Sequence, residues 1–195
     1  TPWKYPENGP ITFFETPWSF TNSIDITGGS EVSAFRLSYT NQDQSGIMPN
    51  SSLKRNNILF NGSYNIVKNL KVSASANYIN TKGKGRNSTG YSDNIMSSFR
   101  QWMQTNVDYQ QQEDIYNATH RNVTWNPVGP YLDENDNTQI DLAPAYWDNP
   151  FFQRFENYET DQRDRIVGYV QADWKINDYF DVMGRYGIDT YNELI

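Results

Sequence analysis

Tyr64-Asn65-Ile66 leads through Val67-Lys68-Asn69 to Leu70-Lys71-Val72, and the same pattern returns from Trp174 to Val182. Each stretch reads aromatic, polar, Ile, three turn residues, large apolar, charged, Val. Apolar and polar residues alternate with a period of two on both sides of a short turn, which is typical of a β-hairpin. Two such hairpins, separated by a long polar segment, predict a sheet with short turns at one end and long loops at the other.

The same alternation predicts six strands. A tight turn at Gly28-Gly29-Ser30, where glycine can supply a positive φ, joins the first strand to the second. The expected strands run from about Ser19–Thr27, Val32–Asn41, Leu53–Ile66, Leu70–Asn80, Thr160–Ile176 and Phe180–Asn192. A polar segment from about Thr81 to Glu159 separates the fourth strand from the fifth. Within it, apolar residues from Ile95 to Met103 recur at helical spacing and predict a short helix with Asp93 as its N-cap.

Three-residue turns fix the register of both hairpins. They place Ile66 opposite Leu70 and Tyr64 opposite Val72 in the first hairpin. In the second hairpin they place Ile176 opposite Phe180, Trp174 opposite Val182, and Lys175 opposite Asp181. This register keeps the apolar residues on one face, because side chains alternate between the two faces of a sheet.

The alternation therefore predicts one polar and one apolar face. The polar face carries Arg36, Asn57, Arg163, Arg165, Arg185 and Asp189, and the apolar face carries Phe35, Ile58, Val170 and Val182. Aromatic residues mark both ends of the apolar face, with Tyr64, Trp174 and Phe180 near the short turns and Phe20, Tyr39 and Tyr78 near the long loops. Two aromatic girdles around an apolar band predict an all-β fold, an antiparallel transmembrane β-barrel segment, with the polar face toward the lumen.

Composition limits the classes of protein that fit. Apolar residues make up 36% of the 195 residues and the mean hydropathy is -0.82, whereas a soluble domain usually carries more apolar residues for its core. Aromatic residues are frequent, at 15%, which argues against disorder. They suit a barrel wall and also a surface that binds sugars or peptides. The net charge of -7, without a long basic run, argues against nucleic acid as a partner.

The sequence also limits membrane and redox classes. It has no cysteine, so it can form neither a disulfide framework nor a thiolate metal site. No apolar run approaches the ~18 residues that a membrane helix needs, whereas barrel strands need only about 10 residues of alternating pattern. Thr1 opens no signal peptide and Ile195 closes the last strand, so we expect an internal part of a longer chain.

We expect no catalytic site, no metal site and no cofactor. The single histidine, His120, lies in the polar segment without a second His or a Cys at metal-site spacing. Catalysis by a Ser-His-Asp triad would have to use His120, and no nucleophile-elbow motif supports it.

The acidic stretch from Asp133 to Asp141 alternates oxygen-bearing side chains, like the first half of a calcium loop. Thr138 and Pro144 stand where such a loop needs Gly and Glu, which favours a solvated turn. The neighbouring Asp133 and Glu134 could resemble the paired carboxylates of a glycosidase, but adjacent residues on a turn are usually polar surface.

The polar segment holds the candidate binding residues. Aromatic rings stack on sugars and anchor protein interfaces, and they can equally pack a long loop on itself; both interpretations stay open. The candidates for contact with a ligand or partner are Trp102, Trp125, Tyr131, Trp147 and Phe151. Trp125 and Trp147 lead, because each lies in a turn-like setting with Asn and Pro.

One stretch resembles a known family. Gly28-Gly29, the run Phe35-Arg36-Leu37-Ser38-Tyr39 and the run Gly46-Ile47-Met48-Pro49-Asn50-Ser51 are similar to the "GG, Y-R-L-S-Y, G-I-x-P-N-S" stretch of SusC/RagA-like TonB-dependent transporters. Phe35 departs from that pattern, where Tyr is usual. Lys54-Arg55-Asn56-Asn57 and the run from Asp161 to Gly168 continue the resemblance, which covers most of the chain except the polar segment.

The resemblance implies an importer in the outer membrane of a Gram-negative bacterium, with a barrel of about 22 strands embedded in outer-membrane lipid. It implies an N-terminal plug, a TonB complex that acts through a part of the protein outside this segment, and a SusD-like surface lipoprotein that closes over the barrel as a lid. The implied cargo is an oligosaccharide or an oligopeptide, and the polar segment would be extracellular and contact cargo or lid. A soluble all-β carbohydrate-binding module and a secreted glycoside hydrolase domain remain as alternatives.

Overall fold

A computed structural model describes residues 4–90 and 94–195 of the chain. They divide into two compact units, which we describe separately. The sheet unit comprises Trp18–Ser45, Ser52–Gly83 and Thr160–Ile195. The loop unit comprises residues 4–17, Gly46–Ser51 and the described part of Lys84–Glu159. The candidate binding residues from the polar segment lie in the loop unit, and the alternating strands lie in the sheet unit.

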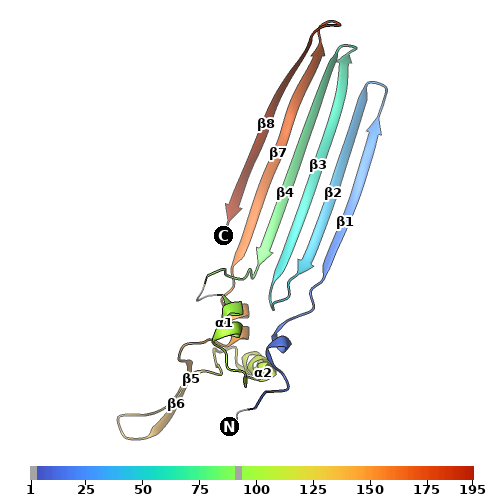
Figure 1. The fold of residues 1–195 in the computed structure, drawn as a ribbon. Helices are drawn as coiled ribbons and strands as arrows, with labels where there is room; N and C mark the ends of the chain where they lie inside the picture. The colour runs from blue at the N-terminus through green and yellow to red at the C-terminus, as the bar shows by residue number, and fades with distance from the viewer. Residues whose placement is uncertain (1–3, 91–93) are drawn as a thin grey trace. The chain divides into compact units, whose positions relative to one another are not determined.

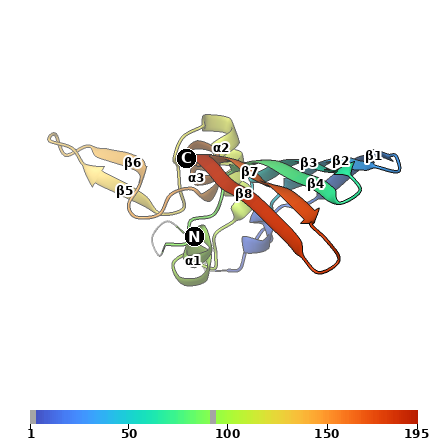
Figure 2. The same ribbon diagram turned by 90° about the horizontal axis from the view of Figure 1, so that it is seen from above.

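The sheet unit is one six-stranded sheet with the order β1-β2-β3-β4-β7-β8 (Figure 1). Its strands are β1 (Ser19–Gly29), β2 (Ser33–Ser45), β3 (Ser52–Val67), β4 (Leu70–Lys84), β7 (Thr160–Lys175) and β8 (Asp181–Leu194). All six expected strands are present, and the structure is mostly antiparallel β. The described sheet is open, with β1 and β8 at its edges. Seen from above, the edge strands β1 and β8 run in different directions (Figure 2), as the twist of β-sheets requires.

Two strands continue beyond the alternating pattern. β2 was expected to end at Asn41 and β4 at Asn80, but they extend to Ser45 and Lys84. The extra residues of β2 are polar, and they remain paired with β1 as far as Gln44, which lies opposite Ser19. Ladder hydrogen bonds join backbone groups, so a strand can continue where the apolar pattern that revealed it has stopped.

The register of the β7–β8 hairpin confirms the prediction. Trp174 lies opposite Val182 and Lys175 opposite Asp181, and the Ile176 N–H donates to the Phe180 carbonyl at 2.9 Å. The Asn177 side chain holds the turn by accepting hydrogen bonds from the backbone N–H groups of Tyr179 and Phe180. The Lys175 ammonium contacts Asp178 at 3.0 Å within the turn.

The β3–β4 hairpin has a shorter turn than expected. Only Lys68 and Asn69 lie outside the strands, so Val67 belongs to β3. Tyr64 and Val72 line the same shallow depression, which places both residues on one face. The individual pairs of this hairpin, including Ile66 with Leu70, stay a prediction.

The turn between β1 and β2 corrects the prediction for Gly28 and Gly29. Both glycines belong to β1 and lie opposite Phe35 and Ala34, and neither has a positive φ. The turn follows them and is closed by a 2.7 Å hydrogen bond from the Ser30 N–H to the Ser33 carbonyl. Gly28 is needed for space instead, since a Cβ there would lie 2.5 Å from the Phe35 ring.

β4 and β7 join across the long polar segment. The Lys175 N–H donates to the Asn69 carbonyl at 2.8 Å near the short turns, and Asp164 accepts hydrogen bonds from Tyr78 and Asn80 near the other end. Lys175, late in β7, meets Asn69 just before β4, and Asp164, early in β7, meets Tyr78 and Asn80 late in β4. The two strands are therefore antiparallel. The polar segment is thus an insertion between neighbouring strands of one sheet.

Gly168 provides a test of this junction. A Cβ at Gly168 would lie 2.5 Å from the backbone oxygen of Ser75 in β4, whereas a Cβ at Gly184 in β8 meets nothing within 4 Å. We expect Gly168→Ala to destabilise the sheet by about 1–3 kcal/mol, because backbone must shift to admit the methyl group. Gly184→Ala is the matched control. Equal unfolding midpoints in urea for the two variants would contradict the described β4–β7 packing.

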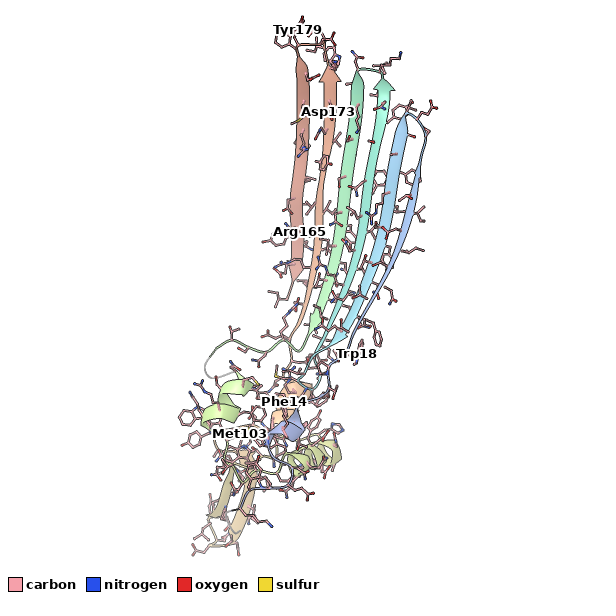
Figure 3. The ribbon with its side chains drawn as sticks, turned by 45° about the vertical axis from the view of Figure 1, so that its right-hand side comes forward. Phe14, Trp18, Met103, Arg165, Asp173 and Tyr179 are labelled. Atoms are coloured by element: carbon pink, nitrogen blue, oxygen red, sulfur yellow. The ribbon has the colours of Figure 1, made fainter. Side chains whose placement is uncertain are left out.

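The loop unit is far more ordered than the predicted single helix. It contains a 3-10 helix, three α-helices and a hairpin: η1 (Pro10–Phe13), α1 (Ile95–Gln101), α2 (Tyr109–Thr119), β5 (Pro127–Leu132), β6 (Thr138–Pro144) and α3 (Pro150–Glu156). Its core consists of Phe13, Ile95, Val107, Tyr109, Tyr116 and Phe151. Phe14 and Met103, labelled in Figure 3, pack against this core. The hairpin β5–β6 extends away from α1 and α2 in both Figure 1 and Figure 2.

The helix N-termini explain why these segments fold. α1 is capped by Asn94, whose side chain accepts from the Met96 N–H, so the prediction of Asp93 as the cap is wrong; Asp93 itself lies outside the described residues. Asp108 caps α2 through the Gln111 N–H, and Asn149 caps α3, which has Pro150 at its first position. Capping side chains replace the missing intrahelical partners of the first N–H groups.

Candidate functional site

The apolar face of the sheet is continuous across all six strands. The strand registers and the contacts between strands show which residues share this face. None of the residues on this face in the middle of the strands carries a charge. The large ones are Ile24, Ile26, Phe35, Leu37, Tyr39, Ile58, Phe60, Tyr64, Val72, Tyr78, Ile166, Val170, Trp174, Val182, Tyr186 and Ile188. Most of them are exposed, Val170 by 54%. Monomeric soluble proteins rarely expose an apolar patch of this extent.

The height of the uncharged band is set by the strand rise. It runs from Ile166 to Trp174 on β7, and from Ile58 to Ile66 on β3. At about 3.3 Å per residue, each stretch spans about 26 Å. Transmembrane barrels present an outward apolar band of about 25 Å. The band therefore has the height that a bilayer requires.

Polar groups begin where the band ends at its long-loop side. Asp43 pairs with Lys54 at 3.3 Å, and Asp164 accepts from the Tyr78 hydroxyl at 2.6 Å. The Tyr39 hydroxyl donates to Asn56 at 2.8 Å on the same face. These tyrosines thus extend an apolar ring along the band and a hydroxyl toward the polar rim, as aromatic residues do at membrane interfaces.

The opposite face carries paired charges. Arg36 contacts Asp25 at 2.8 Å, Arg163 contacts Glu193 at 2.9 Å, and Arg165 contacts Asp189 at 2.5 Å. Arg185 donates to Gln171 at 2.7 Å, and Asn57 lies opposite Thr40 in the register. Figure 3 marks Arg165 and Asp173 along β7. All six residues expected on the polar face, Arg36, Asn57, Arg163, Arg165, Arg185 and Asp189, therefore share one face.

The aromatic candidates of the loop unit divide into buried and accessible rings. Phe151 is only 3% exposed and belongs to the core, so the prediction that it contacts cargo is wrong. Trp125 packs against the same core and its indole Nε1 is buried without a partner. The sequence does not reveal that these two rings are buried. The core that buries them is assembled from several distant segments, and such a core leaves no periodic pattern in the sequence.

Two tryptophans form an accessible pair. Trp102 and Trp147 stack with ring centroids 5.6 Å apart and an angle of 21° between the planes, and Trp102 is 46% exposed. Tyr131 is exposed on the hairpin β5–β6. These three of the five candidates keep rings available for a ligand or partner.

Polar residues that the sequence analysis did not single out join segments of the loop unit. The buried Asn149 side chain donates to the carbonyls of Gln112 and Val123 at 2.8 and 2.9 Å while it caps α3. The buried Arg154 donates to the carbonyls of Pro49 and Gly85 at 2.9 and 2.5 Å. The Asn149-Pro150 pair, a preferred helix start, was the available signal for the first of these; Arg154 had none.

The acidic stretch forms the turn between β5 and β6. The Asp133 carboxylate accepts the backbone N–H groups of Asn135 and Asn137, both at 2.9 Å. These bonds, led by the one from Asn137, hold the pKa of Asp133 below its usual value. Its oxygens are thus occupied by the turn. Within the described residues, no group of three or more His, Cys, Asp or Glu side chains could hold a metal ion.

His120 is the C-cap of α2. It adopts a left-handed backbone conformation with φ 50°, and its ring meets the edge of the Tyr116 ring at 5.3 Å. Burial, with a hydrogen bond to Glu156, raises the pKa of Tyr116 to about 12. Both residues therefore have a structural place at the end of α2.

No helix in the described part of the chain is long and apolar enough to cross a membrane.

Comparison of the sequence with the models of known protein families gives no match, and no curated protein matches it at a significant level.

Proposed function

We propose that this chain is part of the wall of an outer-membrane β-barrel that imports nutrients, of the SusC/RagA-like, TonB-dependent kind. One observation carries the proposal: an uncharged apolar band about 26 Å high crosses six antiparallel strands, while the opposite face is lined by ion pairs. In a barrel, the first face meets lipid and the second lines the lumen.

The lengths of the connections between strands also support a barrel wall, and they indicate which end of the strands is extracellular. The connections β1–β2, β3–β4 and β7–β8 are short, whereas the segment between β4 and β7 carries the helices and hairpin of the loop unit. Barrels of this kind have short periplasmic turns and long extracellular loops. The loop unit is then the extracellular surface that contacts cargo and a SusD-like lipoprotein lid, with the Trp102–Trp147 pair as its leading aromatic contact.

The activity proposed is binding and transport without covalent chemistry. The cargo is an oligosaccharide or oligopeptide, and import is energised by a TonB complex acting through another part of the protein. The exposed apolar band disfavours the soluble alternatives, a carbohydrate-binding module or a glycoside hydrolase, since a β-sandwich would bury such a face between two sheets.

Fractionation and uptake assays test this function. We expect the full-length protein in the outer-membrane fraction, and we expect its deletion to abolish uptake of a labelled oligosaccharide or oligopeptide. Uptake in the wild-type strain should also stop when a protonophore collapses the inner-membrane proton gradient. Recovery of the intact protein in the soluble periplasmic or secreted fraction would refute the proposal.

A further inference from the structure

The loop unit contains a polar cavity. It has a volume of about 600 Å³ and lies between the start of α1, the residues around α3 and the segment after β4. The charged and amide side chains that line it are Arg86, Asn87, Asp148, Gln153, Arg154, Asn157 and Glu159. Its volume falls in the range of small-molecule sites, about 300–1,000 Å³.

Two arginines line the cavity, Arg86 and Arg154, and Arg154 is the buried one. Its guanidinium is buried, with the residue only 6% exposed, and its hydrogen bonds go to two neutral carbonyls, those of Pro49 and Gly85. Burial lowers the pKa of Arg154, an effect that Glu15 partly opposes. The two carbonyls use two of the five N–H donors of a guanidinium. A ligand carboxylate at this place would bring a charge-assisted hydrogen bond and balance a buried cation.

The negative side of the cavity is formed by two carboxylates. Asp148 is oriented by the Asn122 amide, which donates to it at 2.8 Å, and Glu159 is exposed. With two arginines and two carboxylates, the lining carries charge of both signs. A ligand that carries one charge of each sign satisfies both sides of the cavity.

The remaining lining distinguishes peptide from sugar. The side-chain amides of Gln153 and Asn157 each offer a donor and an acceptor, which matches the N–H and C=O of a peptide bond. Among the described residues that line the cavity there is no aromatic ring, so a sugar ring would find no stacking surface here. The Trp102–Trp147 pair is not part of this lining.

We propose that this cavity binds a short peptide by its two charged ends. The peptide carboxylate lies toward Arg154, the peptide ammonium toward Glu159 and Asp148, and the amides of Gln153 and Asn157 hydrogen-bond to the peptide backbone. The proposal rests on the proposed import function and narrows its cargo to oligopeptides with free ends.

Isothermal titration calorimetry on the full-length protein in detergent tests this inference. The probes are trialanine, its N-acetylated form, its C-amidated form and the neutral sugar maltotriose. We expect trialanine to bind, and we expect either blocking group to weaken binding about tenfold, the effect of losing one charge-assisted hydrogen bond. Maltotriose should show no binding that competes with trialanine.

Glu159→Gln is the decisive variant, because the Glu159 side chain is exposed and the change preserves its shape. It should weaken trialanine about tenfold and leave N-acetyl-trialanine unchanged. Glu134→Gln in the β5–β6 turn is the matched control and should alter neither. Equal effects of Glu159→Gln on the two peptides, or competition between maltotriose and trialanine, would overturn the proposal. Outer-membrane fractionation of the same protein tests the import function separately: a protein that inserts but binds no peptide refutes only this site.

Discussion

Replacing Val170 by Arg is expected to destabilise the membrane-inserted protein by about 2–4 kcal/mol. Val170 lies in the middle of the uncharged band on β7, between Ile166 and Trp174, and its side chain is exposed on the apolar face. In a barrel wall, an arginine at this level would bring its charge into the hydrocarbon, where water cannot solvate it. The measurement is the free energy of unfolding in urea of the full-length protein in lipid vesicles.

The neighbouring residue supplies the control for this experiment. Gln171 lies on the opposite face, where its side chain accepts a hydrogen bond from Arg185 and donates to Asp173. Gln171→Arg loses the bond from Arg185 and sets two arginines opposite each other, a cost of about 1 kcal/mol. It should still change the unfolding free energy less than Val170→Arg, because its charge stays on the polar face beside Asp173. Losses of equal size for the two variants would show that the two faces do not meet lipid and water as proposed.

Phe151→Ala is expected to destabilise the loop unit by about 3–5 kcal/mol. The Phe151 ring contacts the Phe13 ring in the core, with centroids 5.3 Å apart, so the substitution leaves a cavity among residues from three distant segments. We expect hydrogen exchange to accelerate in α2 and α3 while the strands of the sheet unit keep their protection. Backbone hydrogen exchange followed by mass spectrometry resolves the two units.

The matched control for Phe151 is Tyr146, an aromatic residue of the same segment that is 85% exposed. Tyr146→Ala removes a ring without opening a cavity and should leave exchange in the helices unchanged. Unchanged exchange in the Phe151→Ala variant would mean that the core of the loop unit is not held by this ring.

The strands were predictable because their signal is local. Successive side chains of a strand point to opposite faces of the sheet, so the faces of Val170 and Gln171 follow from their positions in the sequence alone. Asn177 and Asp178 likewise marked the β7–β8 turn, and its register was confirmed. A local pattern also misled: Gly28-Gly29 predicts a turn, whereas both glycines lie in β1, where a Cβ at Gly28 would meet the Phe35 ring and a Cβ at Gly29 the Ser33 carbonyl.

The loop unit was not predictable in the same way, because the residues of its core lie far apart in the sequence. Phe13, Tyr109 and Phe151 come from three separated segments, and no periodicity connects them. Phe151 therefore looked like any exposed loop aromatic. Arg154 likewise shows its role only through carbonyls at Pro49 and Gly85, far away in the sequence.

Site-directed spin labelling along β7 tests the central claim, that the apolar face of this sheet meets lipid, most directly. The 195 residues contain no cysteine, so single cysteines can be introduced one at a time from Ile166 to Trp174, leaving out Gly168, where a Cβ meets the Ser75 backbone, in the full-length protein, in lipid vesicles. We predict accessibility to oxygen, which concentrates in lipid, at the even-numbered positions. Accessibility to a water-soluble nickel complex should peak at the odd-numbered positions, with a period of two. High nickel accessibility at Val170 and its even-numbered neighbours would contradict the account.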